Sequence, residues 1–187
     1  MNIILFGPPG AGKGTQSQYL VNKLNNFQIS TGDILRDEIK KNSDIGQQIT
    51  SNMNEGKFVS DEIVNALIKK LIDDPQKKDK LIFDGYPRSL SQAKNLDLLL
   101  DRSNQKIDFI FFLNVNKETI IKRIEKRKIL ENRSDDNTDT ILKRYDTYME
   151  TTRPVLDYYS SNSNFHEING TQEIDQITKE IETFINV

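Results

Sequence analysis

The sequence predicts an α/β protein in which a five-stranded parallel sheet is flanked by helices. Three observations carry this prediction. Short apolar runs alternate with longer stretches of helical period, a glycine-rich turn separates the first apolar run from the first helical stretch, and 187 residues suffice for one domain with a proper core. Strands of a parallel sheet are covered on both faces and therefore read as continuous apolar runs.

The elements follow in chain order. The runs IILF, FQI, LIF, IDFIFFL and FHEI are expected to form the strands, at residues 3–6, 27–29, 81–83, 107–113 and 165–168. Stretches of helical period fill the gaps, at residues 13–24, 34–41, 61–72, 90–100, 117–128, 140–159 and 173–184. The last helix is the clearest, because Ile174, Ile177, Ile181 and Phe184 recur on one face. That stripe is expected to contact the core.

Two stretches interrupt the alternation. Residues 43–58 are polar and carry Gly46 and Gly56, which favours a small excursion outside the main sheet. Residues 126–139 are charged throughout, which suits a short exposed flap. In the alternative interpretation, both are solvated connections between core elements.

Composition and charge narrow the class of protein. The 26 basic and 28 acidic residues give a net charge of −2, so any anion site has to be built locally. No cysteine is present, which excludes disulfides, thiolate-zinc sites and a cysteine nucleophile. The single histidine, His166, has no second histidine at ligand spacing and is expected to be structural or on the surface. Because there is no basic leader and no run of about 20 apolar residues, we expect a cytoplasmic protein.

The stretch GPPGAGKGT, residues 7–15, carries the first chemical signal. It fits the phosphate-binding pattern G-x-x-x-x-G-K-[ST] through Lys13, but Gly14 stands at the hydroxyl position and Thr15 follows it. Between a strand and a helix, such glycines let backbone N–H groups converge on phosphate oxygens, while Lys13 adds a positive charge. A glycine-rich turn without a ligand is the alternative. The glycines do not fall as G-x-G-x-x-G, which argues against a dinucleotide site.

A phosphate-binding loop alone does not separate switches, motors and kinases. The stretch NKET, residues 116–119, is close to the N-K-x-D element that reads guanine, but Thr119 cannot supply the carboxylate that accepts hydrogen bonds from the base. Asn116 and Glu118 are better explained as the cap and the first turn of a helix.

Arginines and one aspartate favour chemistry on phosphates. The arginines are spread along the chain, and several lie at strand ends, at helix ends or in the flap, where the loops of an α/β sheet gather on its binding side. The candidates for such a site are Arg36, Arg88, Arg123, Arg127, Arg133 and Arg144. Together, such planar donors would neutralise moving negative charge, although any one alone is more often a surface residue.

Asp84 ends a strand where a carboxylate can hold magnesium-bound water, and Arg88 follows in the same crevice. A strand-capping turn is the alternative for this aspartate.

Five ordered motifs run along the chain: GPPGAGKGTQ at 7–16, ISTGDILR at 29–36, EGKFVSDEIV at 55–64, DGYPRSLSQA at 84–93, and the region 123–159. Together they resemble the nucleoside-monophosphate kinases and, among them, the adenylate kinase family in its short-lid form. The resemblance covers essentially the whole chain and implies a three-layer P-loop nucleotide kinase fold. It also implies a monomer built from three parts: a core over 1–29, 60–125 and 137–187, a monophosphate-binding excursion over 30–59, and a lid over 126–136.

On the ATP side, the resemblance accounts for Gly14, because family members carry glycine where the general pattern has a hydroxyl. The residues implied to bind ATP are Gly10, Ala11, Gly12, Lys13, Gly14, Thr15, Arg123, Arg127 and Gln172. Gln172 stands where relatives often have lysine, and its contact is expected through the backbone. Magnesium is implied as the cofactor, held mainly by phosphates and water with help from Asp84. Zinc is not expected, because the cysteines of the long zinc-bearing lid are absent.

On the acceptor side, the residues implied to bind AMP are Thr31, Arg36, Lys57, Phe58, Val59, Gly85, Tyr86, Pro87, Arg88 and Gln92, joined on closure by Arg133 and Arg144. Thr31 and Gln92 bear most on the choice of base, because a glutamine amide offers a donor and an acceptor to an adenine edge. AMP is therefore favoured over CMP or UMP. The stretch RSDDN, residues 133–137, instead resembles the pyrimidine enzymes.

The implied activity is reversible phosphoryl transfer from ATP-Mg to AMP, giving two ADP without a covalent intermediate or a general base. The groups implied to serve catalysis are Lys13, Asp84, Arg88, Arg123, Arg133 and Arg144. The expected partners are ATP, AMP and ADP, with neither nucleic acid nor membrane. Two alternatives stay open: a UMP/CMP kinase of the same family, and a nucleotide-dependent switch or binding module, which would hydrolyse nucleotide slowly without an acceptor.

Overall fold

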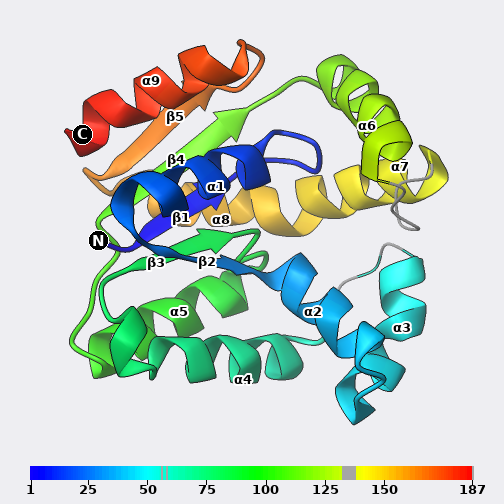
Figure 1. Cartoon of the computed structure of the whole chain (residues 1–187), viewed down its shortest axis with the longest axis horizontal. Coiled ribbons are helices and arrows are strands. Elements are labelled where there is room, and N and C mark those ends of the chain that lie inside the picture. The colour runs from blue at the N-terminus through cyan, green and yellow to red at the C-terminus, as the bar shows by residue number, and fades with distance from the viewer. Residues whose placement is uncertain (56, 58, 132–137, 187) are drawn as a thin grey trace.

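Five parallel strands form one sheet in the order β2-β3-β1-β4-β5 (Figure 1). The computed structural model describes residues 1–55, 57, 59–131 and 138–186, with the side chains of 126–131, 138, 139 and 141 outside the description. The strands are β1 (Ile3–Phe6), β2 (Phe27–Ser30), β3 (Leu81–Asp84), β4 (Phe109–Asn114) and β5 (Phe165–Asn169). The predicted sheet is confirmed. The fourth strand starts later than predicted, and Asp108 instead accepts a hydrogen bond from the Asn2 backbone N–H at 2.7 Å.

Helices cover both faces of the sheet (Figure 1). They are α1 (Lys13–Leu24), α2 (Thr31–Lys40), α3 (Asp44–Asn54), α4 (Asp61–Ile72), α5 (Leu90–Arg102), α6 (Lys117–Glu131), α7 (Thr138–Thr147), α8 (Arg153–Tyr159) and α9 (Ile174–Ile185). A 3₁₀ turn, Pro75–Lys77, follows α4, and a π-helical turn, Tyr148–Thr152, joins α7 to α8. The predicted bounds of α1 and α4 are confirmed, whereas α2 begins three residues before its predicted start.

The sheet divides the core into two halves, because side chains alternate along each strand. Ile4 and Phe6 of β1 belong to the half that α4, α5 and α8 cover, and Ile3 and Leu5 to the half that α1, α6 and α9 cover. This arrangement gives the predicted three layers. In α9, Ile177 and Ile181 are buried as expected. The prediction for Ile174 is wrong, since it is 55% exposed at the first position of the helix.

The polar stretch after residue 43 contains a helix that was not predicted. In α3, Ile45, Ile49 and Met53 recur every four residues and pack against the core. Gly46 does not mark a turn: a Cβ atom there would lie 2.1 Å from the backbone oxygen of Glu38 in α2. The glycine therefore permits α2 and α3 to pack closely, and the two helices extend beyond the carboxyl end of β2 (Figure 1).

The helix predicted over 140–159 is interrupted near its centre. Proline has no N–H group, and its ring crowds the carbonyl four residues earlier, so Pro154 cannot continue a regular α-helix behind it. The chain widens into the π turn Tyr148–Thr152 and then begins α8 with Pro154 in its first turn. Two of the residues in this turn, Tyr148 and Thr152, are buried.

Candidate active site

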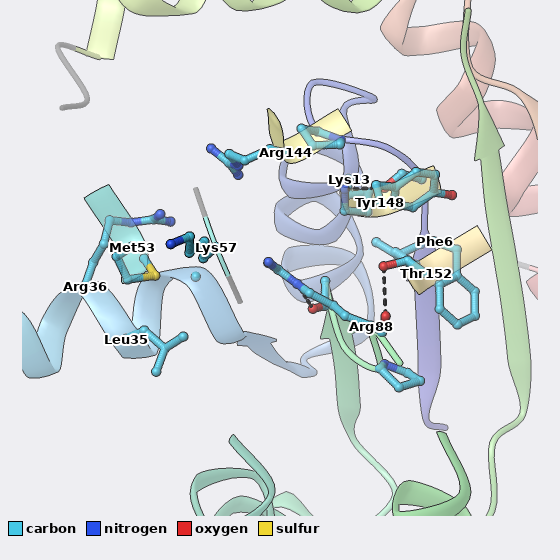
Figure 2. A pocket seen from close by; sticks show the side chains of 16 residues that line it. Phe6, Lys13, Leu35, Arg36, Met53, Lys57, Arg88, Arg144, Tyr148 and Thr152 are labelled. Carbon is cyan, nitrogen blue, oxygen red and sulfur yellow. Dashed lines mark hydrogen bonds between the residues drawn. The ribbon is translucent and has the colours of Figure 1, made fainter. Parts of the chain in front are cut away.

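A cleft opens at the carboxyl ends of β1 and β3, beside the point where the chain crosses from one half of the sheet to the other. In open α/β sheets, ligands bind in the crevice at such a switch point. Four segments far apart in sequence line the cleft (Figure 2): the loop after β1, the turn after β3, the α2–α3 region, and the chain from α7 to the π turn. Their polar and charged lining residues include Lys13, Arg36, Lys57, Arg88, Arg144, Tyr148 and Thr152.

The glycine-rich loop folds around its own lysine. The Lys13 ammonium group donates to the backbone oxygens of Gly7 and Pro8 at 2.7 and 3.1 Å. Gly10 has a φ of +81°, and a Cβ atom there would lie 2.8 Å from Ile124 of α6, so the turn requires glycine for both conformation and space. Gly12 precedes α1 with a φ of +97°. Gly14 and Thr15 are exposed at the start of α1, where the N–H groups and helix dipole attract anions.

Asp84, the last residue of β3, lies beside the first turn of α1. A Cβ atom built on Gly14 would be 3.7 Å from Oδ2 of Asp84, and the same oxygen accepts a hydrogen bond from Nε2 of Gln28 at 2.9 Å. Among the described residues, no group of three or more His, Cys, Asp or Glu side chains could hold a metal. A single carboxylate at the phosphate-binding loop fits magnesium, which keeps several waters and takes phosphate oxygens as ligands.

Arg88 follows the turn after β3 and directs its guanidinium into the cleft. Its Nε donates to the backbone oxygen of Gly85 at 2.7 Å, and Gly85 adopts a φ of +74°. Burial lowers the pKa of Arg88 to about 10, with smaller contributions from the charges of Arg144 and Arg36, while Asp84 raises the pKa. The group therefore stays protonated at neutral pH. Three guanidinium groups near one another in a partly desolvated cleft repel, and a polyanion between them would relieve that repulsion.

The acceptor-side residues lie on α2, on the chain after α3 and at the turn after β3. Thr31 donates to the backbone oxygen of Gly85 at 2.9 Å. Arg36 forms an ion pair with Asp33 at 2.6 Å, and Lys57 one with Glu55 at 2.6 Å. Val59 is buried in the core, and Pro87 follows a cis peptide bond from Tyr86 and lines the cleft.

Gln92 and Tyr86 lie behind the cleft lining. Gln92 is 2% exposed, its Nε2 donates to Asp61 at 2.7 Å, and its Oε1 accepts from the backbone N–H of Arg88 at 2.7 Å. Tyr86 donates its hydroxyl to Asn65 at 2.9 Å, and burial raises its pKa to about 12, so it is neutral at physiological pH. The structure therefore ties Gln92 to Arg88 rather than presenting its amide openly to the cleft.

Arg123 of α6 connects the two ends of the predicted ATP site. Its guanidinium donates to the backbone oxygens of Ala11 and Gln172, each at 3.3 Å. The loop, Arg123 and Gln172 are thus brought together, while their binding of ATP stays a prediction. The side chain of Arg127, and Phe58 and Arg133 altogether, lie outside the described residues.

Sequence reasoning missed several residues of the cleft. Leu35 and Met53 line its acceptor side, and Tyr148 and Thr152 its opposite wall. The signal for the latter pair was present, because Arg144, Tyr148 and Thr152 recur every four residues and so share one helical face. Thr152 also donates to the backbone oxygen of Arg88 at 2.9 Å.

A sequence model described as adenylate kinase matches residues 5–164. The chain belongs to the adenylate kinase family. The family resemblance and the P-loop nucleotide kinase fold expected from the motifs are confirmed. The chain is accordingly a nucleoside-monophosphate kinase, and neither the pyrimidine kinase nor the switch is favoured.

Relatives that carry the family name match along nearly their whole length. An adenylate kinase of Pelagibacter ubique (strain HTCC1062) is 48% identical over 213 aligned residues that take in all of both chains. One of Mycoplasma capricolum subsp. capricolum is 44% identical over 90% of this chain and 91% of its own. One of Caulobacter sp. (strain K31) is 40% identical over 100% of this chain and 99% of its own. Among the residues that the structure describes, every helix is too short or too polar to span a bilayer.

Proposed function

We propose that this chain transfers the γ-phosphoryl group of ATP, bound with magnesium, to the phosphate of AMP, and that the reaction runs reversibly to two ADP. The observation that carries the proposal is the cleft: it is lined on one side by the phosphate-binding loop, on the other by Arg36 and Lys57, and between them by Arg88 and Arg144. Two polyanions placed end to end would bring their reacting phosphates among these cations.

On the donor side, the loop from Gly10 to Thr15 would hold the ATP phosphates through backbone N–H groups and Lys13. Arg123 and Gln172 lie beside the loop and would complete this site, with Arg127 on the same helix. Asp84 would hold magnesium through water, and the metal when bound would supply charge neutralisation for the bridging phosphates. In the fold, Asp84 receives one hydrogen bond from Gln28 that orients its carboxylate.

On the acceptor side, Arg36, Arg88 and Arg144 would grip the AMP phosphate, with Lys57 at the rim. The other residues proposed to bind AMP are Thr31, Phe58, Val59, Gly85, Tyr86, Pro87, Gln92 and Arg133. Residues 30–59 would act as a mobile monophosphate-binding part and residues 126–136 as a lid, so that closure brings the arginines together and excludes water. We further propose a monomer that works in the cytoplasm.

The chemistry needs no general base. The phosphate acceptor is already an anion at neutral pH, so the protein has to align the two nucleotides and neutralise the charge that spreads over the transferred group. Arg88 suits this role because its backbone and its Nε are both hydrogen-bonded within the fold, which fixes the start of the side chain.

A coupled assay for ADP formation tests the proposal. The wild-type protein with ATP and magnesium is expected to form ADP rapidly only when AMP is added. CMP, UMP and GMP in parallel reactions are expected to be poor acceptors. Slow hydrolysis that AMP does not accelerate would overturn the kinase assignment in favour of a switch, and faster turnover of CMP or UMP would overturn the choice of AMP.

A further inference from the structure

Three threonine hydroxyls in and beside the π turn donate to different kinds of acceptor. The hydroxyl of Thr147 donates to the backbone oxygen of Lys143, and that of Thr151 to the backbone oxygen of Thr147, each one turn back in the same helical segment. Thr152 instead reaches a residue 64 positions away, the backbone oxygen of Arg88, at 2.9 Å (Figure 2). Thr152 is 4% exposed, so water does not replace this donor.

Together with two other hydrogen bonds, the bond from Thr152 restrains the position of Arg88. Its backbone N–H is held by Gln92, its backbone oxygen by Thr152, and its Nε by the backbone oxygen of Gly85. Two of these constraints come from the neighbouring turn and helix. The one from Thr152 comes from the opposite wall of the cleft, which also carries Arg144.

Thr152 departs from the usual behaviour of a helical threonine. Threonine hydroxyls inside a helix normally bond to a carbonyl three or four residues back, as Thr147 and Thr151 do. Thr152 is the last residue of the π turn, directly before α8 begins, and its hydroxyl bonds the turn after β3 instead. Such π turns are frequent at functional sites.

We propose that Thr152 is a positioning residue for the reaction: through its hydroxyl it holds the main chain of Arg88, and so the Arg88 guanidinium, in the geometry that phosphoryl transfer requires. This inference rests on the proposed function, because it gives Arg88 its role there. Thr152 adds no charge to the cleft and need not touch either nucleotide. It acts through Arg88.

Thr152→Val tests the inference, since valine keeps the shape and removes the hydroxyl. Small misplacements of a catalytic group are costly, so the single-turnover rate of phosphoryl transfer is expected to fall about tenfold. Because Arg88 is also proposed to grip AMP, the dissociation constant for AMP is expected to rise, while that for ATP changes less than about twofold. Thr152→Ser keeps the hydroxyl and is expected to restore most of the rate. Thr151→Val is the matched control, because it removes an adjacent hydroxyl that bonds its own helix, and it is expected to leave the rate near that of the wild type.

A double-mutant cycle with Arg88→Ala separates positioning from general stability. If Thr152 acts through Arg88, adding Thr152→Val to Arg88→Ala is expected to change the transfer rate by less than about twofold. The inference is overturned if the valine costs the same factor in both backgrounds, or if Thr151→Val matches Thr152→Val. Should Thr152→Val fail to fold, the cycle is run with Thr152→Ala, and circular dichroism confirms the fold of each variant. The proposed function fails separately, if the wild type shows no AMP-dependent turnover.

Discussion

The two sides of the cleft are built differently. The phosphate-binding loop follows β1, whose four residues are at most 2% exposed, and hydrogen bonds inside the loop join Ala11 N–H and the Lys13 ammonium group to backbone oxygens. The acceptor side depends on α2 and α3, where of the 11 residues of α3 only Gly46 and Ile49 are buried. The donor side is therefore part of the sheet core, while the acceptor side depends on α2 and α3, which pack closely on each other but leave most residues of α3 unburied. This difference indicates that, apart from the proposed lid, movement is expected on the acceptor side.

The largest effect is expected where both sides meet, at Arg88. Arg88→Ala should retain its fold and lose at least about two orders of magnitude in rate, since loss of one donor to the transition state commonly costs about 3–4 kcal/mol. Steady-state ADP formation with saturating ATP and AMP measures the loss, and thermal melting measures the fold. Near-normal turnover would remove Arg88 from the site.

Gly46→Ala is expected to have a smaller effect on activity, confined to the acceptor side of the cleft. The new methyl group would meet the Glu38 backbone at 2.1 Å, so α3 has to move away from α2. Overpacking of this kind costs about 1–3 kcal/mol, and the KM for AMP is expected to rise about tenfold while the KM for ATP changes less than about twofold.

The matched control for that variant is Gln48→Ala on the exposed face of α3, which is expected to leave both constants unchanged. Equal changes in the KM for ATP and for AMP after Gly46→Ala would show that the two sides do not move independently.

Substitution of His166, which lies far from the cleft, is expected to have the smallest effect on the catalytic rate. Its ring stacks on Phe184 with centroids 4.0 Å apart, and burial lowers its pKa below the ordinary 6.5. The unfolded chain therefore binds a proton more readily than the folded one, and this group reduces stability as the pH falls below 6.5. His166→Phe is expected to keep the wild-type rate and to lose less of its melting temperature between about pH 7.5 and about pH 5.5. A large loss of rate would instead place His166 in the mechanism.

Local sequence signals predicted the parts of the fold in which one segment determines its own structure. The bounds of α1 and α4 follow from the helical period of residues 13–24 and 61–72, and the structure matches both. Helix α3 was not predicted, because a glycine such as Gly46 inside a helix has the same appearance in sequence whether it ends the helix or lets a neighbouring helix pack closely. The sequence around Gly46 does not show this difference, because the α2 backbone that packs against the glycine belongs to another segment.

The grouping of the candidate residues could be foreseen in outline because each motif is contiguous. Lys13, Arg36, Arg88 and Arg144 come from four separate motifs, and all four line one cleft. The sequence did not reveal that Asp61 holds the Gln92 amide or that Thr152 holds the Arg88 backbone. These contacts depend on how α4 and the π turn pack against the turn after β3. The sequence pattern within a single segment does not predict how that segment packs against another.

The lysine that the loop already encloses has a thermodynamic consequence. Since the Gly7 and Pro8 oxygens hold the Lys13 ammonium group in a folded loop, a triphosphate is expected to exchange these partners without first ordering a coil. Calorimetry of ATP binding alone should then report a small heat-capacity change, typical of a preformed receptor, whereas a bisubstrate mimic that also draws in α2 and α3 should report a larger negative one.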